Sequence, residues 1–124
     1  MKYIYLILCL FTTSIAFGQP AAGDFQSHQT GDWNQTSTWE RFDGVSWVTP
    51  APSTPTDADG VITILSSHTV TITADVSIDE TTIQTGAVVV LNSGINLDFP
   101  TFLFNDALTI SGTFTNNGSF NLGI

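Results

Sequence analysis

The second half of the chain alternates between apolar and polar residues in short segments. From residue 61 onward, apolar residues recur two positions apart, which places them on one face of a β-strand. No window has a sustained 3.6-residue period, so we expect essentially no helix after residue 18. The expected inward pairs are Ile62/Ile64, Val70/Ile72, Val76/Ile78, Val88/Val90, Ile95/Leu97, Phe102/Phe104, Leu108/Ile110 and Phe120/Leu122, with Ile83 and Phe114 as single inward residues.

Two all-β architectures suit strands this short. The segment centres are about six or seven residues apart, with Asn, Asp, Ser and Gly between them. A sandwich of antiparallel hairpins usually has longer strands, spaced about 8–12 residues apart. In a β-solenoid, about three short strands form one coil of roughly 20 residues, and coils stack at about 4.8 Å. The close spacing therefore predicts an all-β fold, the start of a right-handed parallel β-helix (solenoid).

Residues 19–60 differ from this pattern. They are rich in Gly, Pro, Ser and Asp, and they contain all three tryptophans. A solenoid needs a cover at each end, because an open end exposes unpaired backbone groups and core side chains. We therefore predict an irregular, Trp-rich capping segment over residues 19–60 and solenoid coils over residues 61–124. The chain stops in mid-pattern, so we expect it to be a fragment with a C-terminal continuation.

Residues 1–18 have the pattern of a cleavable signal peptide. Lys2 supplies the positive start, Ile4–Phe11 supplies a short apolar run, and Ala16 and Gly18 are the small residues that signal peptidase recognises. This run is shorter than the roughly 20 apolar residues of a membrane-spanning helix. It contains Cys9, the only cysteine. We predict removal of residues 1–18, no membrane insertion afterwards, and a protein that is secreted or attached to the cell surface.

The charge of the chain narrows the range of partners. The net charge is −9, with eleven acidic and two basic residues, and only Arg41 of the basic residues lies after residue 18. Such a surface repels the phosphates of nucleic acid and anionic membranes. We therefore exclude nucleic acid as a partner and keep extracellular glycans and surface proteins as candidates.

The tryptophans are the candidate ligand-binding residues. Trp33, Trp39 and Trp47 would suit a carbohydrate site, since the apolar face of a sugar stacks on an indole ring. The alternative is a hydrophobic cap over the first coil, because large aromatic side chains are mostly buried for packing. We favour the cap.

The other polar residues predict neither a metal site nor a catalytic site. Asp57 and Asp59 offer two oxygen ligands where Ca²⁺ takes six to eight, which favours an Asp-rich turn. His28 and His68 are far apart in the chain and lack neighbouring ligands. With Arg41 as the only base after residue 18, polysaccharide-cleaving chemistry is hard to build from the acids, and we expect no enzyme and no cofactor. The acids considered are Asp75, Asp79, Glu80, Asp98 and Asp106.

Several segments together resemble a known module. Gly31–Trp39, Pro55–Ile64 and His68–Ile72, followed by Leu108–Phe114 and Asn116–Phe120, resemble the opening of large secreted surface proteins of Bacteroidetes that use type IX secretion. The pattern is similar to the G8-like module, a β-strand domain named for its glycines. Ser67 departs from that pattern, which usually has Gly before the histidine. The resemblance implies a surface scaffold or adhesin-like role and supplies no catalytic residues.

The sequence thus predicts a secreted, non-catalytic structural or adhesin-like module. The alternative is the N-terminal part of a carbohydrate-binding or polysaccharide-degrading β-helix protein. A third possibility, a small ligand-binding sandwich, would require antiparallel hairpins in place of stacked coils.

Overall fold

The computed structural model describes residues 19–100 and 108–123. Within these ranges the protein is almost entirely β, with one short 3-10 helix, η1 (Thr36–Thr38). The predicted all-β class is confirmed. The expected signal peptide, together with the Phe102/Phe104 pair, lies outside the described residues.

The largest sheet has six strands. They are β1 (Phe25–Ser27), β3 (Trp39–Phe42), β4 (Trp47–Val48), β5 (Ile62–Ile64), β8 (Thr81–Ile83) and β11 (Leu108–Ile110). Their order is β11-β8-β5-β1-β3-β4. The pairs from β11 to β1 are parallel, whereas β3 and β4 extend the sheet beyond β1 in antiparallel fashion.

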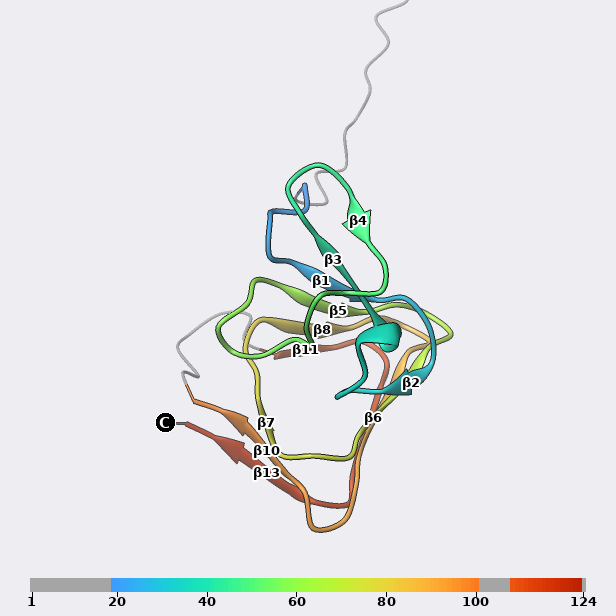
Figure 1. Cartoon of the computed structure of the whole chain (residues 1–124). Helices are drawn as coiled ribbons and strands as arrows, with labels where there is room; N and C mark the ends of the chain where they lie inside the picture. Colours follow the sequence, from blue (N-terminus) through green and yellow to red (C-terminus); the bar gives the residue numbers. More distant parts are fainter. Residues whose placement is uncertain (1–18, 101–107, 124) are drawn as a thin grey trace, which may run out of the picture.

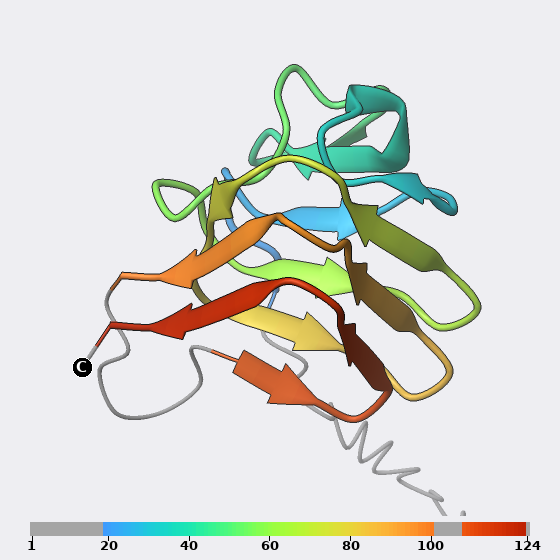
Figure 2. The same cartoon turned by 90° about the horizontal axis from the view of Figure 1, so that it is seen from below.

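Two further sheets are parallel throughout. One contains β2 (Gly31–Asp32), β6 (Thr69–Ile72), β9 (Val88–Leu91) and β12 (Thr113–Asn116), and the other contains β7 (Val76–Ser77), β10 (Asn96–Phe99) and β13 (Ser119–Leu122). From β5 to β13 the chain enters the six-, four- and three-stranded sheets in turn, three times over. Figure 1 shows these sheets as three sides around a common interior, and Figure 2 shows their strands lying side by side.

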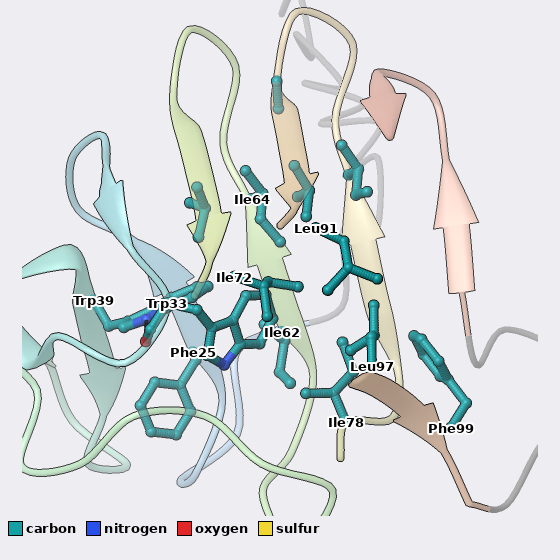
Figure 3. Close-up of a cluster of buried hydrophobic side chains, with 14 of the residues drawn as sticks. Phe25, Trp33, Trp39, Ile62, Ile64, Ile72, Ile78, Leu91, Leu97 and Phe99 are labelled. Carbon is teal, nitrogen blue, oxygen red and sulfur yellow. Dashed lines mark hydrogen bonds between the residues drawn. The ribbon is translucent and has the colours of Figure 1, made fainter. Parts of the chain in front are cut away.

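The interior between the sheets is filled by apolar side chains from all three sides (Figure 3). Residues at equivalent positions of neighbouring strands lie opposite each other: Ile64 opposite Ile83, and Ile72 opposite Leu91. These four side chains are 0–1% exposed. Burying a side chain of this size contributes about 1.5–3 kcal/mol. Because the expected inward residues of β5 and β6 are buried, the alternation in those strands did predict their inner face.

Among the expected inward pairs, Val88/Val90 is assigned to the wrong face, and Ile110 and Leu122 of the last layer are not buried, at 46% and 41% exposure. In β9, Val89 and Leu91 are buried at 2% and 0% exposure, while Val88 and Val90 face outward and are only partly covered. The register explains the difference, because Val89 lies opposite Val70 of β6. Four consecutive apolar residues fit a strand in either orientation, and a shift of one residue exchanges its two faces.

Glycines allow close approach where the chain turns between sheets. A Cβ atom on Gly112 would lie 2.3 Å from the Gln84 carbonyl oxygen and 2.4 Å from that of Ala87. A Cβ atom on Gly118 would likewise lie 2.4 and 2.5 Å from two backbone carbonyl oxygens, in the corresponding turn of the neighbouring layer. Any larger residue at either position would force the two backbone segments apart.

Residues 19–60, for which irregular structure was predicted, contain β1 to β4. In this segment β1 and β2 extend two of the sheets by pairing in parallel with β5 and β6. The chain then forms η1 and the β3–β4 hairpin, whose two strands extend the six-stranded sheet beyond β1. Further along, the Asp57 N–H donates a 2.9 Å hydrogen bond to the Ser77 carbonyl of β7. The three tryptophans lie between the end of β2 and β4.

Candidate functional site

The tryptophans do not form one platform. Trp33 and Trp39 are 2% and 0% exposed and meet edge to face, with ring centroids 4.7 Å apart. The Trp33 indole N–H donates to the Pro55 carbonyl at 3.0 Å, and that of Trp39 donates to the Trp33 carbonyl at 2.8 Å. Figure 3 shows both rings beside Phe25, at one end of the apolar core. Because both rings are enclosed, neither offers a face to a sugar.

Trp47 occupies a different environment. It is only partly buried and packs against Phe42, with ring centroids 5.3 Å apart. The two residues are partners in the β3–β4 ladder and lie on the outer face of the six-stranded sheet. Of the three sequence-predicted candidates, Trp47 is the one whose ring reaches the surface.

A groove runs along this outer face beside Trp47. Gln26 of β1, Thr63 of β5 and Thr82 of β8 are register partners and form its floor, while Trp47 and Asp24 contribute to its sides. Its volume is about 980 Å³, at the upper end of the range of small-molecule sites. We call it the Trp47 groove. Sequence analysis identified Trp47, but the three floor residues are brought together only by the strand register.

The turn of the hairpin that carries Trp47 is closed by Asp43. One carboxylate oxygen of Asp43 accepts hydrogen bonds from the backbone N–H groups of Val45 and Ser46, each at 2.8 Å. These two bonds stabilise the ionised form and hold the pKa of the Asp43 carboxyl below its ordinary value.

We therefore expect the Asp43 carboxyl to titrate below the ordinary range of aspartate in a carbon-detected NMR titration. Because the pKa is lower in the folded than in the unfolded protein, ionised Asp43 stabilises the hairpin above the unfolded-state pKa. That contribution is lost as the pH falls through the folded-state value. Asp43→Asn should retain the turn but remove this pH dependence. An ordinary pKa for Asp43 would contradict the expectation.

The two histidines have separate partners. His28 Nδ1 lies 3.5 Å from a carboxylate oxygen of Glu40. His68 Nδ1 lies 2.7 Å from Ser27 Oγ, which also accepts a 2.9 Å hydrogen bond from the Leu65 N–H. With its oxygen accepting from Leu65, the hydroxyl can donate to Nδ1 of a neutral imidazole. Ser27 is fully buried and His68 is partly exposed, so this pair links β1 to the turn after β5.

Sequence reasoning missed Ser27 altogether. It is separated from His68 by 41 positions, and a serine among polar residues carries no signal of burial. Only the parallel pairing of β1 with β5 brings the two side chains together.

The acidic residues considered for catalysis or metal binding mostly have structural partners. Asp75 accepts hydrogen bonds from the backbone and side-chain N–H groups of Asn96, at 2.8 and 3.2 Å. Asp98 accepts from the Asn121 amide at 2.7 Å, so both acids link neighbouring strand layers. Asp59 closes a turn by accepting from the Thr56 N–H at 2.8 Å.

The remaining acids add no grouped site. Asp79 accepts from the N–H of Glu80 at 2.9 Å, and Glu80 itself has a positive φ of 40°. Asp106 lies outside the described residues. Over residues 19–100 and 108–123, no three His, Cys, Asp or Glu side chains gather in a way that would hold a metal ion. In the same ranges, no helix has the length and apolarity to span a bilayer.

Arg41, the only basic residue after residue 18 apart from the histidines, points away from the groove. Its guanidinium lies 5.9 Å from the centroid of the Phe25 ring, and its buried Nε has no hydrogen-bond partner in the described part of the chain. The Trp47 groove therefore has no cationic side chain from Lys or Arg. Its chemistry is that of an indole ring, hydroxyls, amides and the carboxylate of Asp24.

Comparison with protein-family models, curated proteins and solved structures found no match for this chain. The resemblance to the G8-like module therefore rests on the sequence segments alone.

Proposed function

We propose that this protein is a secreted, cell-surface structural or adhesin-like module, built as the start of a right-handed parallel β-helix. The observation that supports the proposal most strongly is the threefold repetition of parallel strands around one apolar interior. The strands β5, β6 and β7 each hydrogen-bond to a strand about 20 residues further along the chain, as in the coils of a solenoid. A body of this kind is stiff, and its outward side chains present regular rows.

The proposed cap also has support from the packing. Trp33 and Trp39 close one end of the apolar interior, and β3 and β4 extend the six-stranded sheet beyond β1. A cover of this kind protects the first layer of strands from solvent and from pairing with other chains. We propose that residues 19–60 serve as this cap and residues 61–124 as the coils. The location rests on the signal-peptide pattern of residues 1–18 and on the acidic composition.

The stacking of coils can be tested by an engineered disulfide. Thr71 and Val90 are outward register partners on β6 and β9, and neighbouring strands are about 4.8 Å apart, within the range that a disulfide spans. The double variant Thr71→Cys/Val90→Cys should therefore form a disulfide under mild oxidation, detected by mass spectrometry of the secreted chain. The matched control, Thr71→Cys/Val88→Cys, places the cysteines two residues out of register and should cross-link far less. Equal cross-linking of both pairs would contradict the stacked register.

The location can be tested in cells. The full chain, expressed in a host of the Bacteroidetes type, should appear outside the cell with Gln19 as its N-terminal residue. N-terminal sequencing and protease treatment of intact cells measure these two properties. Retention inside the cell with Met1 still present would overturn the proposed function.

A further inference from the structure

The outer face of the six-stranded sheet combines an aromatic surface with a polar floor. Phe42 and Trp47 lie at one side, and the register partners Gln26, Thr63 and Thr82 continue across the parallel strands. Both parts line or adjoin the same groove. This position beside a polar surface distinguishes Trp47 from the two buried tryptophans, which pack in the interior.

The indole of Trp47 is held in a fixed orientation. Its ring packs on Phe42 at an interplanar angle of 60°, and the hairpin that carries it is closed by the hydrogen bonds of Asp43. The hairpin is further joined to β1 through Glu40, which accepts hydrogen bonds from the Gln26 amide and the Thr49 hydroxyl. A preordered aromatic ring binds a flat apolar partner with little loss of conformational entropy.

The floor of the groove carries free hydrogen-bonding capacity. The hydroxyls of Thr63 and Thr82 make no hydrogen bond within the described part of the chain, and both side chains are partly exposed. Gln84 uses its amide oxygen to accept from the Ser66 N–H, which leaves its NH₂ group toward solvent. Hydroxyls and amides in a row across the strands, about 4.8 Å apart, match the hydroxyl-rich edge of a sugar chain.

The charge of the surface selects among sugar chains. Asp24 lines the groove and Glu40 lies beside its floor, whereas the Arg41 guanidinium is turned toward Phe25 on the other face. Gln19 also lines the groove, and cleavage before it would add one positive α-amino group, which is fewer than the two carboxylates. With a net charge of −9, the protein repels polymers that carry carboxylates or sulfates. A neutral polysaccharide meets no such repulsion.

We propose that the Trp47 groove binds a neutral polysaccharide, with one sugar ring stacked on Trp47 and with hydroxyls of rings further along the same polysaccharide bonded to Thr63 and Thr82. This inference rests on the proposed function of an extracellular module and names the ligand class of its outer face. The binding involves no covalent step.

The test uses the secreted chain and four polysaccharides in affinity gel electrophoresis, followed by calorimetry. Laminarin and galactomannan are the neutral probes, and alginate and polygalacturonate are the anionic ones. We expect at least one neutral polysaccharide to retard the protein, and neither anionic one to do so. Trp47→Ala should weaken that binding at least tenfold, Trp47→Phe should retain part of it, and Thr63→Val/Thr82→Val should weaken it without removing the aromatic contact.

Val48→Ala is the matched control. Val48 is the next residue in β4, is 39% exposed, and lies opposite Arg41 on the face away from the groove. It should bind as the unaltered protein does. Urea unfolding of each variant shows whether a loss of binding reflects a loss of folding.

Three results would overturn the inference: no retardation by either neutral polysaccharide, unchanged binding by Trp47→Ala, or tighter binding of an anionic polysaccharide. Each of these leaves the proposed function standing if the protein is still exported and cleaved before Gln19. Failure of export, in contrast, overturns the proposed function irrespective of what the groove binds.

Discussion

Replacing Trp39 with alanine lowers the free energy of unfolding by about 3–5 kcal/mol, the largest loss that we expect from a single substitution in the cap. The Trp39 side chain is fully buried, contacts the rings of Phe25 and Trp33, and donates its indole N–H to a buried carbonyl. Its removal leaves a cavity and an unpaired Trp33 carbonyl oxygen. Both effects act in the same direction.

Such a loss is large compared with the total stability of a domain of this size, which is about 5–15 kcal/mol. We therefore expect a markedly lower urea midpoint for Trp39→Ala with little change in slope, measured by far-ultraviolet circular dichroism so that the lost fluorophore does not affect the signal.

The matched control for this substitution is Trp47→Ala. It removes the same side chain from a partly exposed position, where the main loss is the contact with Phe42. An aromatic pair of this kind contributes about 0.5–1.5 kcal/mol beyond its buried area, so the loss should be much smaller than for Trp39→Ala. Equal losses for the two variants would contradict the distinction between a packing tryptophan and a surface tryptophan.

Substituting alanine for Gly112 destabilises the protein by about 1–3 kcal/mol or more, through overpacking. The added Cβ would lie 2.3 and 2.4 Å from two carbonyl oxygens of the preceding turn, which belong to backbone and cannot rotate away. Relief requires the turn before β12 to move outward, which lengthens the hydrogen bonds that join it to residues 83 and 87.

The control is Gly94→Ala. Gly94 has a positive φ of 77° but no atom within 4 Å of the added Cβ, so it reports the cost of the backbone conformation alone. That cost is about 1–2 kcal/mol. Chemical denaturation of both variants compares the two effects. If Gly112→Ala were as stable as the unaltered protein, neighbouring layers could not be in the close contact described above.

The sequence predicted which face of a strand is buried wherever polar residues alternate with apolar ones and so identify the outward face. In β5 and β6, threonines alternate with Ile and Val, so only one orientation buries the apolar residues. The run from Val88 to Leu91 contains no polar residue, and its orientation is determined by the strands on either side of β9. Periodicity within one segment cannot contain that information.

The candidate site was predictable only in part, for a related reason. Composition alone identified Trp33, Trp39 and Trp47 as one group of candidates. The sequence of this segment does not indicate which of the three indole rings is buried. Their separation depends on where β1 and β3 pair, and on the return of the chain at Pro55. The floor of the Trp47 groove likewise combines residues from three strands that are distant in sequence.

The strands β8, β9 and β10 each pair in parallel with an equivalent strand on both sides, which affects how such a protein can change length. A tandem duplication of residues 81–100 would supply a new layer whose partners are the same on each flank. The gene can therefore lengthen by whole units without redesign of the interior. The length of the molecule can then change independently of the surface at its tryptophan end.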